Sequence, residues 1–371
     1  MDVALAGLSA LFWLGALLQP WFSWLQRETL EREAPVPLDP YNLEDVTVVI
    51  PARNEAAIIG LTLAALAGQG EGLRVILVDD RSDDGTAGVA RRVPGLNLTI
   101  VPGAPLPEGW AGKLWALDQG VRCVQTPLTL LLDADIGLAP GVIASLKHLM
   151  TDGARNFVSV MAELHMQSFW ERLLLPAFIL YFKSLYPFAL ANGPTKRVAA
   201  AAGGCILLET RLFADIGGLQ VMRGALIDDC TLASQVKARG ARTWIGLSRR
   251  VTCVRPYRGL SEIWNMIARS AYTQLGYSPL ILALLTLVMA LLFWMPVIGL
   301  MIPNPSTRLL SLTAWLGMVA FHWPTWRFYG LSPLWPLLTP LIGTLYLSMT
   351  WSSALRYYRG VRSEWKGRTY R

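Results

Sequence analysis

The chain has 371 residues, of which 53% are hydrophobic and 16% are charged, whereas an average soluble domain has about 25% charged residues. This composition excludes a disordered or collagen-like chain, and the length accommodates two or three domains. The net charge is +7, and the tail from Arg356 to Arg371 holds six basic residues against Glu364. A basic tail after an apolar region is typical of a membrane-surface anchor, and we expect no nucleic-acid partner.

Cysteine and histidine usage excludes two further classes of site. The cysteines have no CxxC spacing and the three histidines form no cluster, so neither a disulfide framework nor a zinc site is indicated. A reducing compartment is favoured. Any metal ion would therefore have to be held by carboxylates.

The first predicted element is a membrane-spanning helix within residues 1–27. The run from Val3 to Gln26 carries no charge, and it is long enough to cross about 30 Å of hydrocarbon. A cleaved signal peptide would begin with basic residues and end with small ones, whereas this run begins after Met-Asp and ends with bulky aromatic residues. We therefore predict an uncleaved anchor. Arg27 and Arg32 follow it, which predicts that the next segment is cytoplasmic.

Residues 45–255 are predicted to form an α/β domain. Four short apolar runs, with predicted helices between them, are predicted to be strands: Val46–Ile50, Val75–Val78, Leu98–Val101 and Leu128–Leu132. Apolar strands that alternate with helices predict a Rossmann-like, mostly parallel sheet covered on both faces. A dinucleotide-binding oxidoreductase would need G-x-G-x-x-G after the first strand. The turn at 51–55 has no glycine, which argues against that class and against a P-loop.

Acidic residues mark the ends of these strands, where ligands of such sheets bind. Asp133 and Asp135 follow the fourth strand and suit Mg²⁺ or Mn²⁺, which prefers one or two carboxylates plus substrate phosphates; alternatively, Asp135 caps the next helix. Asp80 follows the second strand, in a segment also rich in turn formers. Asp228 and Asp229 begin a predicted helix, so Asp228 is a candidate cap. Asp229, kept ionised by the helix dipole, is a candidate general base.

Taken together, these motifs resemble glycosyltransferase family 2, whose members have the GT-A fold. Five blocks in the family's order carry the resemblance: Val49–Glu55, Val78–Thr86, Gly112–Leu117, Leu132–Asp135 and Ile227–Asp229. The resemblance implies a nucleotide-sugar donor, a divalent ion, Mg²⁺ or Mn²⁺, and an inverting displacement.

The resemblance also implies residue roles by position. The residues implied to bind the nucleotide sugar are Pro51, Arg53, Glu55, Asp80, Lys113 and Asp133. Asp133 and Asp135 would hold the metal, and Asp229 would be the catalytic base. Gly204, Cys205 and Asp228 are assigned to the acceptor region, where the glycine pair Gly203-Gly204 allows close approach to the backbone. The alternatives there are a tight turn and a small buried cysteine.

A finer similarity is to the hopanoid-biosynthesis-associated glycosyltransferases, and more distantly to ceramide glucosyltransferase. It is carried by the stretches 103–115, 168–174, 185–188, 201–205, 223–231 and 272–279, and it implies a hopanoid-type lipid acceptor. Many membrane members of family 2 carry Q-x-x-R-W after the base, whereas in Met266–Ser270 only Arg269 fits. A processive polysaccharide synthase is therefore disfavoured. Arg269 is expected at the diphosphate or, alternatively, on an amphipathic helix at the membrane interface.

The remaining segments are predicted to associate with the membrane. Residues 168–191 and 256–279 are predicted as interfacial helices or as the wall of an acceptor channel, with ordinary core packing as the alternative. Lys183 argues against a full span. Residues 280–355 form a predicted transmembrane region, with spans near 280–302, 309–326 and 331–352. A cytoplasmic basic tail requires an even number of spans, so either one span is re-entrant or the tail is external.

The sequence thus predicts a GT-A domain between N-terminal and C-terminal transmembrane helices, in a multi-pass protein of the cell inner membrane with a cytoplasmic catalytic domain. The leading hypothesis is a membrane-bound inverting glycosyltransferase that moves a sugar from a nucleotide donor to a lipid hydroxyl. One alternative is a polyprenyl-phosphate glycosyltransferase, whose anionic acceptor needs no base. The other is a non-catalytic membrane scaffold with a degenerate domain.

Overall fold

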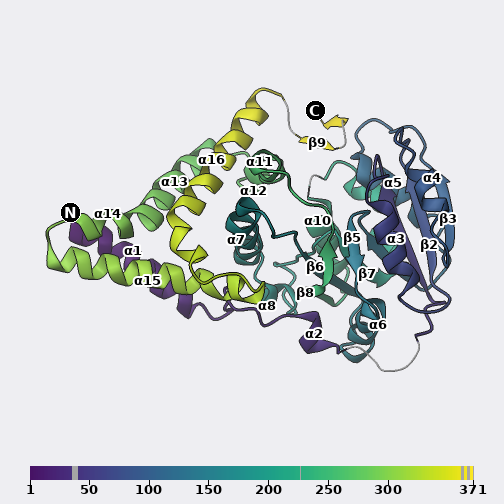
Figure 1. Cartoon of the computed structure of the whole chain (residues 1–371), viewed down its shortest axis with the longest axis horizontal. Coiled ribbons are helices and arrows are strands. Elements are labelled where there is room, and N and C mark those ends of the chain that lie inside the picture. The colour runs from purple at the N-terminus through teal and green to yellow at the C-terminus, as the bar shows by residue number, and fades with distance from the viewer. Residues whose placement is uncertain (36–40, 226, 361–362, 366–367, 371) are drawn as a thin grey trace.

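The computed structural model of the chain describes residues 1–35, 41–225, 227–360, 363–365 and 368–370. A sheet domain occupies one end of the molecule and a group of long helices occupies the other (Figure 1). Helices α7 (Phe169–Leu185), α11 (Leu260–Ala268) and α12 (Ala271–Gln274) lie between these two parts.

The described strands of the domain form one eight-stranded sheet in the order β3-β2-β1-β4-β7-β6-β8-β5. Their bounds are β1 Val46–Ala52, β2 Arg74–Asp79, β3 Asn97–Pro102, β4 Leu128–Leu132, β5 Ile136–Leu138, β6 Phe157–Glu163, β7 Cys205–Glu209 and β8 Thr243–Cys253. Strands β1 to β4 are parallel, and each contains the strand predicted for it. However, β7 is antiparallel to β4 and β6, and β5 is antiparallel to β8. Strands β6 and β8 are again parallel to each other, so within the described sheet only β7 and β5 run against the other six strands. The sheet is therefore mixed but mostly parallel, as predicted.

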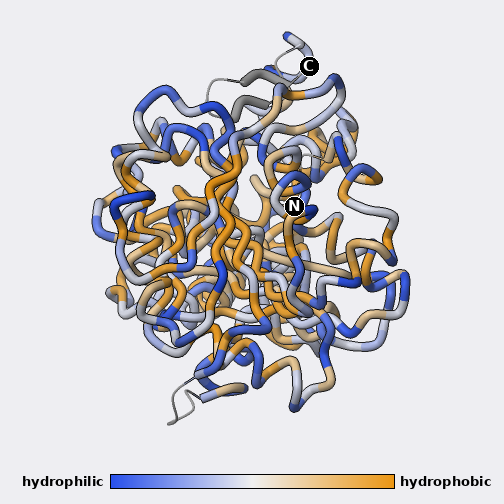
Figure 2. The backbone as a smooth tube through the Cα atoms, turned by 90° about the vertical axis from the view of Figure 1, so that its right-hand side faces the viewer, coloured by the Kyte–Doolittle hydropathy of each residue, from blue (hydrophilic) through white to orange (hydrophobic). Residues whose placement is uncertain are grey.

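Alternation along the strands divides the core into two layers. In β1, Val48 and Ile50 pack on the side covered by α3 (Ile59–Ala67) and α6 (Val142–Asp152), whereas Val49 packs on the opposite side. The opposite side is covered by α5 Gly112–Val121, α9 Arg211–Ile216, η1 Leu219–Met222 and α10 Asp228–Ala238. Figure 2 shows the central strands as mainly hydrophobic and many of the outer loops as hydrophilic. Because both faces are covered, only the strand ends remain available to ligands.

The described part of the chain has one helix that is long and apolar enough to cross a membrane, Pro279–Met301. It consists of α13 (Pro279–Met289), a π-helical turn η2 (Ala290–Trp294) and α14 (Met295–Met301), and it coincides with the span predicted at 280–302. The π-helical turn places the carbonyl of Leu292 where it accepts a hydrogen bond from Trp13 Nε1 at 2.9 Å. This bond joins the candidate spanning helix to the first helix of the chain.

The N-terminal helix is shorter than predicted. Helix α1 comprises 17 residues, Asp2–Leu18, and at 1.5 Å per residue it is about 26 Å long. It ends before Pro20, which breaks the run that the apolar composition suggested. A single transmembrane anchor over residues 1–27 is therefore not confirmed. Helix α1 instead packs along α15 (Pro305–Phe328).

The other two predicted spans differ in extent from the helices found. Helix α15 begins earlier and ends later than 309–326, and it continues through Pro324. Helix α16 (Thr339–Tyr358) begins only after the 3₁₀ turn η3 (Trp335–Leu338), so the predicted start at 331 was wrong. Neither α15 nor α16 is apolar enough to count as a candidate span. The predicted transmembrane region 280–355 is therefore confirmed only as one candidate span.

Helix α7 is a buried helix and does not lie open on a surface. It starts at a capping box formed by Ser168 and Glu171, and its central residues pack between the sheet domain and α15, α16 and α11. Lys183 is fully buried, and its ammonium donates to the Leu25 carbonyl at 2.7 Å and to Gln26 Oε1 at 2.9 Å. For residues 168–191, the structure therefore fits the core-packing alternative.

The segment predicted as one interfacial helix over 256–279 forms two helices, α11 and α12, interrupted at Arg269 and Ser270. Helix α11 is amphipathic, with Ile263 and Ile267 buried and Glu262 exposed. The short elements not yet placed are α2 Leu30–Glu33, α4 Thr86–Arg91, α8 Phe188–Ala191, β9 Ser363–Trp365 and β10 Arg368–Tyr370. Residues 361–362, 366–367 and 371 of the predicted basic tail lie outside the described residues.

Candidate functional site

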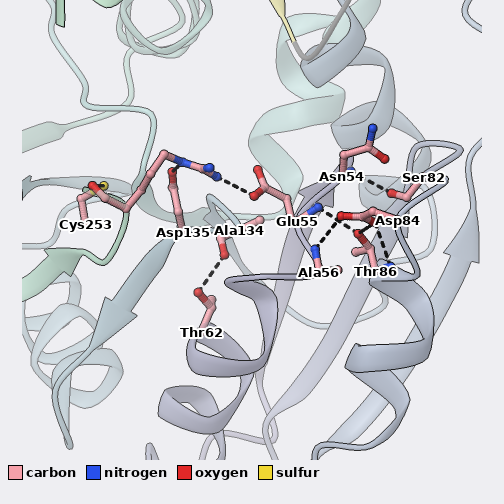
Figure 3. Close-up of polar contacts among 11 residues, drawn as sticks. Asn54, Glu55, Ala56, Thr62, Ser82, Asp84, Thr86, Ala134, Asp135 and Cys253 are labelled. Carbon is pink, nitrogen blue, oxygen red and sulfur yellow. Dashed lines mark hydrogen bonds and ion pairs between the residues drawn. The ribbon is translucent and has the colours of Figure 1, made fainter. Parts of the chain in front are cut away.

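The loops that follow β1 and β2 are locked to each other. The backbone N–H of Asn54 donates to Ser82 Oγ at 3.0 Å (Figure 3). The N–H of Asp83 donates to Asn54 Oδ1 at 3.0 Å. Asn54 and Arg81 adopt the left-handed conformation, with φ of 53° and 56°. Such strain in non-glycine residues persists only where the surroundings enforce it, and it is concentrated at functional sites. Both loops lie at the carboxyl ends of adjacent parallel strands.

A second set of bonds explains the turn residues of this loop pair. Asp84 accepts hydrogen bonds from the N–H groups of Ala56 and Thr86, at 2.9 and 3.0 Å. Burial acts to raise the pKa of Asp84, but bonds from Thr86 and Ala56 outweigh it and lower the pKa. Thr86 Oγ1 in turn accepts from the N–H of Glu55 at 2.9 Å. Asp84 therefore serves the loop, as its turn-rich sequence indicates.

Of the predicted nucleotide-binding residues, Asp80 and Arg53 lie together. Asp80 is fully buried, and its N–H donates to the Ala52 carbonyl at 2.8 Å. Arg53 Nη1 donates to the Asp80 carbonyl at 2.7 Å, whereas Pro51 is buried within β1 itself. Gly103 packs against this corner, because a Cβ there would lie 2.8 Å from Asp80 Cα. The sequence analysis missed Gly103, since nothing in the spacing reveals that close approach.

Lys113 lies among carboxylates that come from two separate segments. At the start of α5, its ammonium is 2.7 Å from Asp133 Oδ1, and the two side chains are 22% and 31% exposed. Burial acts to lower the pKa of Lys113, but the carboxylates of Asp133, Asp228 and Asp229 outweigh it and raise the pKa above its usual value. Burial and Asp135 raise the pKa of Asp133, although Lys113 opposes the rise. The lysine therefore stays charged and holds the acidic groups together.

Asp229 lies in the first turn of α10, where its carboxylate is held by backbone donors. Its Oδ2 accepts from the N–H of Gly203 at 2.8 Å, and its Oδ1 accepts from the N–H of Cys230 at 2.7 Å. Burial, with the neighbouring Asp228, raises the pKa of Asp229 to about 6, while these backbone bonds and Lys113 act in the opposite direction. A carboxylate with a pKa near the working pH is suited to accept a proton.

The glycine pair before β7 has an unexpected division of roles. Gly203 contacts both charged groups, since a Cβ there would lie 3.2 Å from Lys113 Nζ and 3.3 Å from Asp229 Oδ2. The predicted acceptor residue Gly204 instead accepts from the Asp133 N–H at 3.0 Å. Cys205 is fully buried in the sheet core. Cys205 therefore fits the alternative of a small buried residue, and its assignment to the acceptor region was wrong.

Arg255, which the sequence analysis missed, links the remaining acidic residues. Its Nε donates to Asp135 Oδ2 at 2.8 Å and its Nη2 to Glu55 Oε2 at 2.5 Å. Figure 3 shows Asp135 and Glu55 on either side of this contact. Antiparallel pairing of β5 with β8 brings Arg255 here, because Ile136 pairs with Cys253. Nothing in the local sequence could have revealed a partner 120 residues away.

Arg269 is related to this cluster through Tyr257. Burial raises the pKa of Tyr257; Cys253 and Asp135 add to the rise, and Arg269 opposes it. Tyr257 therefore lies within electrostatic reach of both Asp135 and Arg269. Its backbone N–H donates to Glu171 Oε1 at 2.8 Å, which fixes the connection between β8 and α11 against α7.

These contacts form a continuous chain of charged groups along one edge of the sheet. A pocket lined by Lys113, Asp133, Gly203, Asp228 and Asp229 lies at one end of the chain, and the Arg255 link lies at the other. Within the described residues, no group of three or more His, Cys, Asp or Glu side chains is placed to hold a metal ion. Asp133 and Asp135 do supply oxygen donors, and a divalent ion that shares its ligands with a phosphate needs only one or two carboxylates.

Comparison with known proteins identifies relatives of the chain. A profile of the family "Glycosyltransferase like family 2" matches residues 44–273. Two curated relatives from Staphylococcus aureus, both 4,4'-diaponeurosporenoate glycosyltransferases, are 37% identical over 97 residues and 32% identical over 134 residues. These matches cover 26% and 35% of this chain, and they span only 25% and 35% of the relatives' own length.

A solved structure shares the fold over nearly the full length of both chains. It is the mannosyltransferase PcManGT from Pyrobaculum calidifontis, solved in complex with GDP-Man and Mn²⁺. The two chains are 18% identical, with a TM-score of 0.55, and the match covers 96% of this chain and 99% of the other. At this identity, the similarity shows the fold alone.

Proposed function

The chain belongs to glycosyltransferase family 2, and on that premise we propose that it is a membrane-bound inverting glycosyltransferase. It transfers a sugar from a nucleotide donor to a hydroxyl group of a lipid. The observation that carries this proposal is the pocket in which Lys113, Asp133 and Asp229 meet, beside the loop pair that follows β1 and β2. A cation for the diphosphate and a carboxylate for the hydroxyl proton lie together there.

The chemistry is a single displacement. The acceptor oxygen forms a bond to the anomeric carbon, and its proton passes to the Asp229 carboxylate. The bond from that carbon to the diphosphate oxygen breaks, and its electron pair leaves with the nucleoside diphosphate. Lys113 neutralises part of the charge on this leaving group, and Gly203 N–H holds Asp229 in position.

Asp133 and Asp135 are the residues that would hold Mg²⁺ or Mn²⁺. When bound, such an ion supplies positive charge for the diphosphate. The proposal is supported by the chemistry of the two carboxylates at the end of β4 and by the Mn²⁺ in the complex of the structural relative. We assign Pro51, Arg53, Glu55 and Asp80 to the nucleoside side of the donor, because their loop pair lies at the adjacent strand ends.

The acceptor is proposed to reach Asp229 from the side of the long helices. Tyr186, just after α7, packs in the same apolar cluster as Cys230, the neighbour of Asp229. Its hydroxyl donates to Gln274 Oε1 of α12 at 2.9 Å. Tyr186 follows the last residue of α7 and Gln274 ends α12, and both helices lie between the sheet domain and the long helices (Figure 1). Asp228 and the backbone at Gly204 complete the proposed acceptor region.

A lipid acceptor and a membrane location are inferred from three features. They are the apolar helix Pro279–Met301, the lipid-like substrate in the names of the two Staphylococcus relatives, and the sequence resemblance to hopanoid-associated enzymes. We propose a hopanoid-type acceptor, with the chain in the cell inner membrane and the sheet domain in the cytoplasm. Arg27 and Arg32 support that orientation.

The proposal is tested by incubating purified full-length chain in detergent with Mn²⁺ or Mg²⁺, a panel of nucleotide sugars and membrane lipid extracts. We expect a glycosylated lipid from one donor, and its formation should fall at least about 10²-fold in Asp229→Asn. If Asp229→Asn keeps most of the activity, the acceptor is an anion such as a polyprenyl phosphate, which needs no base. If no donor is consumed and no nucleoside diphosphate raises the melting temperature, the chain is a scaffold.

A further inference from the structure

Arg255 is held by two carboxylates that come from opposite sides of the candidate site. Its Nε contacts Asp135 Oδ2 and its Nη2 contacts Glu55 Oε2, at 2.8 and 2.5 Å. The arginine side chain is 32% exposed, whereas that of Glu55 is 8% exposed. The guanidinium therefore has a well-buried anchor on Glu55 and a more accessible partner, Asp135.

The backbone around Arg255 fixes this arrangement. The N–H of Val254 donates to the carbonyl of Asp135 at 2.9 Å, so the end of β8 is tied to the residue that Arg255 contacts. On the other side, the N–H of Glu55 is held by Thr86 Oγ1, within the loop pair assigned to the nucleoside. The ends of β1, β4 and β8 thus meet through one side chain.

A guanidinium and a divalent cation would compete for the Asp135 carboxylate, because Arg255 Nε already occupies its Oδ2 and like charges repel. Arginine is charged at every working pH, and burial, which acts to lower its pKa, is outweighed here by Asp135 and Glu55, which raise it further. Deprotonation therefore cannot release Asp135, and only movement of the side chain can. Nε can leave Asp135 while Nη2 keeps its contact with Glu55, so the movement needs no break in the buried anchor.

We propose that Arg255 is a positioning residue that guards the cation site, so that a divalent ion binds well only together with the nucleoside diphosphate. This inference rests on the proposed function, since it takes Asp135 as a ligand and a diphosphate as part of the donor. The diphosphate supplies anionic oxygens that replace Asp135 as the partner of the guanidinium. Ion and nucleotide then bind with positive coupling, which thermodynamic linkage makes reciprocal.

The experiment measures Mn²⁺ binding to full-length chain in detergent, from the electron paramagnetic resonance signal of free Mn²⁺. Titrations are run without nucleotide and with UDP or GDP, corrected for Mn²⁺ bound to free nucleotide. In the unmodified chain, one nucleotide should tighten Mn²⁺ binding at least about tenfold. In Arg255→Gln, Mn²⁺ alone should bind about tenfold more tightly, and the tightening by nucleotide should fall below about threefold.

Arg249→Gln is the matched control, because Arg249 lies in β8, the strand that precedes Arg255, is 57% exposed and pairs with Glu163 away from the site. It should bind Mn²⁺ as the unmodified chain does. If Arg255→Gln fails to fold, Glu55→Gln loosens the same anchor and should shift Mn²⁺ affinity in the same direction by a smaller factor.

Two results would overturn the inference, and they differ in what else they refute. If nucleotide-dependent Mn²⁺ binding is present and Asp135→Asn abolishes it, yet Arg255→Gln binds Mn²⁺ alone no more tightly, Arg255 only ties the strand ends together. The cation site proposed with the function would then survive. If Mn²⁺ binds to no variant even with nucleotide, the assignment of that site and the role of Arg255 are refuted together.

Discussion

Replacing Asp229 by asparagine should abolish activity and at the same time stabilise the fold. The carboxylate has a pKa of about 6, against 3.8 for an ordinary aspartate, because it is buried beside Asp228. A shift of roughly two units corresponds to at most about 3 kcal/mol at 1.36 kcal/mol per unit. Partial exposure of Asp229 reduces this gain in folding free energy. The loss of one charge-assisted hydrogen bond from Gly203 or Cys230 reduces it further. We therefore expect a net gain of about 1 kcal/mol above pH 6.

The sign of this effect depends on pH. The folded-state pKa of Asp229 is raised, so the ionised carboxylate destabilises the fold; this cost is absent below pH 3.8, grows between pH 3.8 and about 6, and is constant above. Thermal unfolding of Asp229→Asn in detergent should show a melting temperature about 2 °C higher at pH 7.5 and little change at pH 4.5. Asp152→Asn, at a residue that is 74% exposed, is the control. A lower melting temperature for Asp229→Asn at pH 7.5 would refute the argument from burial.

Three further predictions concern the same pocket. Gly203→Ala places a methyl group 3.2 Å from Lys113 Nζ and 3.3 Å from Asp229 Oδ2, so the transfer rate should fall about tenfold while Gly259→Ala, which meets nothing within 4 Å, leaves it unchanged. Lys113→Met removes the cation next to Asp133, and calorimetric titration should show that nucleoside diphosphate binds at least about tenfold more weakly. Unchanged nucleotide affinity would show that the lysine only stabilises the fold. Because the base must be ionised, the rate measured against pH should fall about tenfold per unit below a pH of about 6, and a flat profile down to pH 5 would contradict the role of Asp229.

The first half of the sheet could be predicted because its strands are short apolar runs that end at polar residues. Each of the four predicted strands is found, and parallel order places Glu55, Asp80 and Asp133 at one edge. The second half could not be predicted in the same way. Along the chain, helical segments separate β6 from β7 and β7 from β8. The antiparallel direction of β7 follows from packing between distant segments.

The residues that complete the site show the same limit. Asp229 could be predicted from its place at the start of a helix, whereas Arg255 reaches Asp135 only through the register of β5 and β8. Gly203 was recognised only as part of a glycine pair, since its contact with Lys113 depends on the position of α5.

Apolar composition also misjudged some of the predicted membrane segments. It cannot distinguish a lipid-facing helix from α7, which is buried by its neighbours, and it did not reveal that α1 ends before Pro20. Hydrophobicity predicts burial but does not identify what buries the helix, and only the packed structure separates protein from lipid as the covering surface.

The proposed function depends most on one carboxylate, Asp229, acting as the base of a single displacement. The most direct measurement is the anomeric configuration of the glycosylated lipid by nuclear magnetic resonance, after reaction with an α-linked nucleotide sugar. We expect a β-linked product from the unmodified chain and a rate of its formation that is at least about 10²-fold lower in Asp229→Asn. An α-linked product, or a β-linked product that Asp229→Asn still forms at the normal rate, would contradict it.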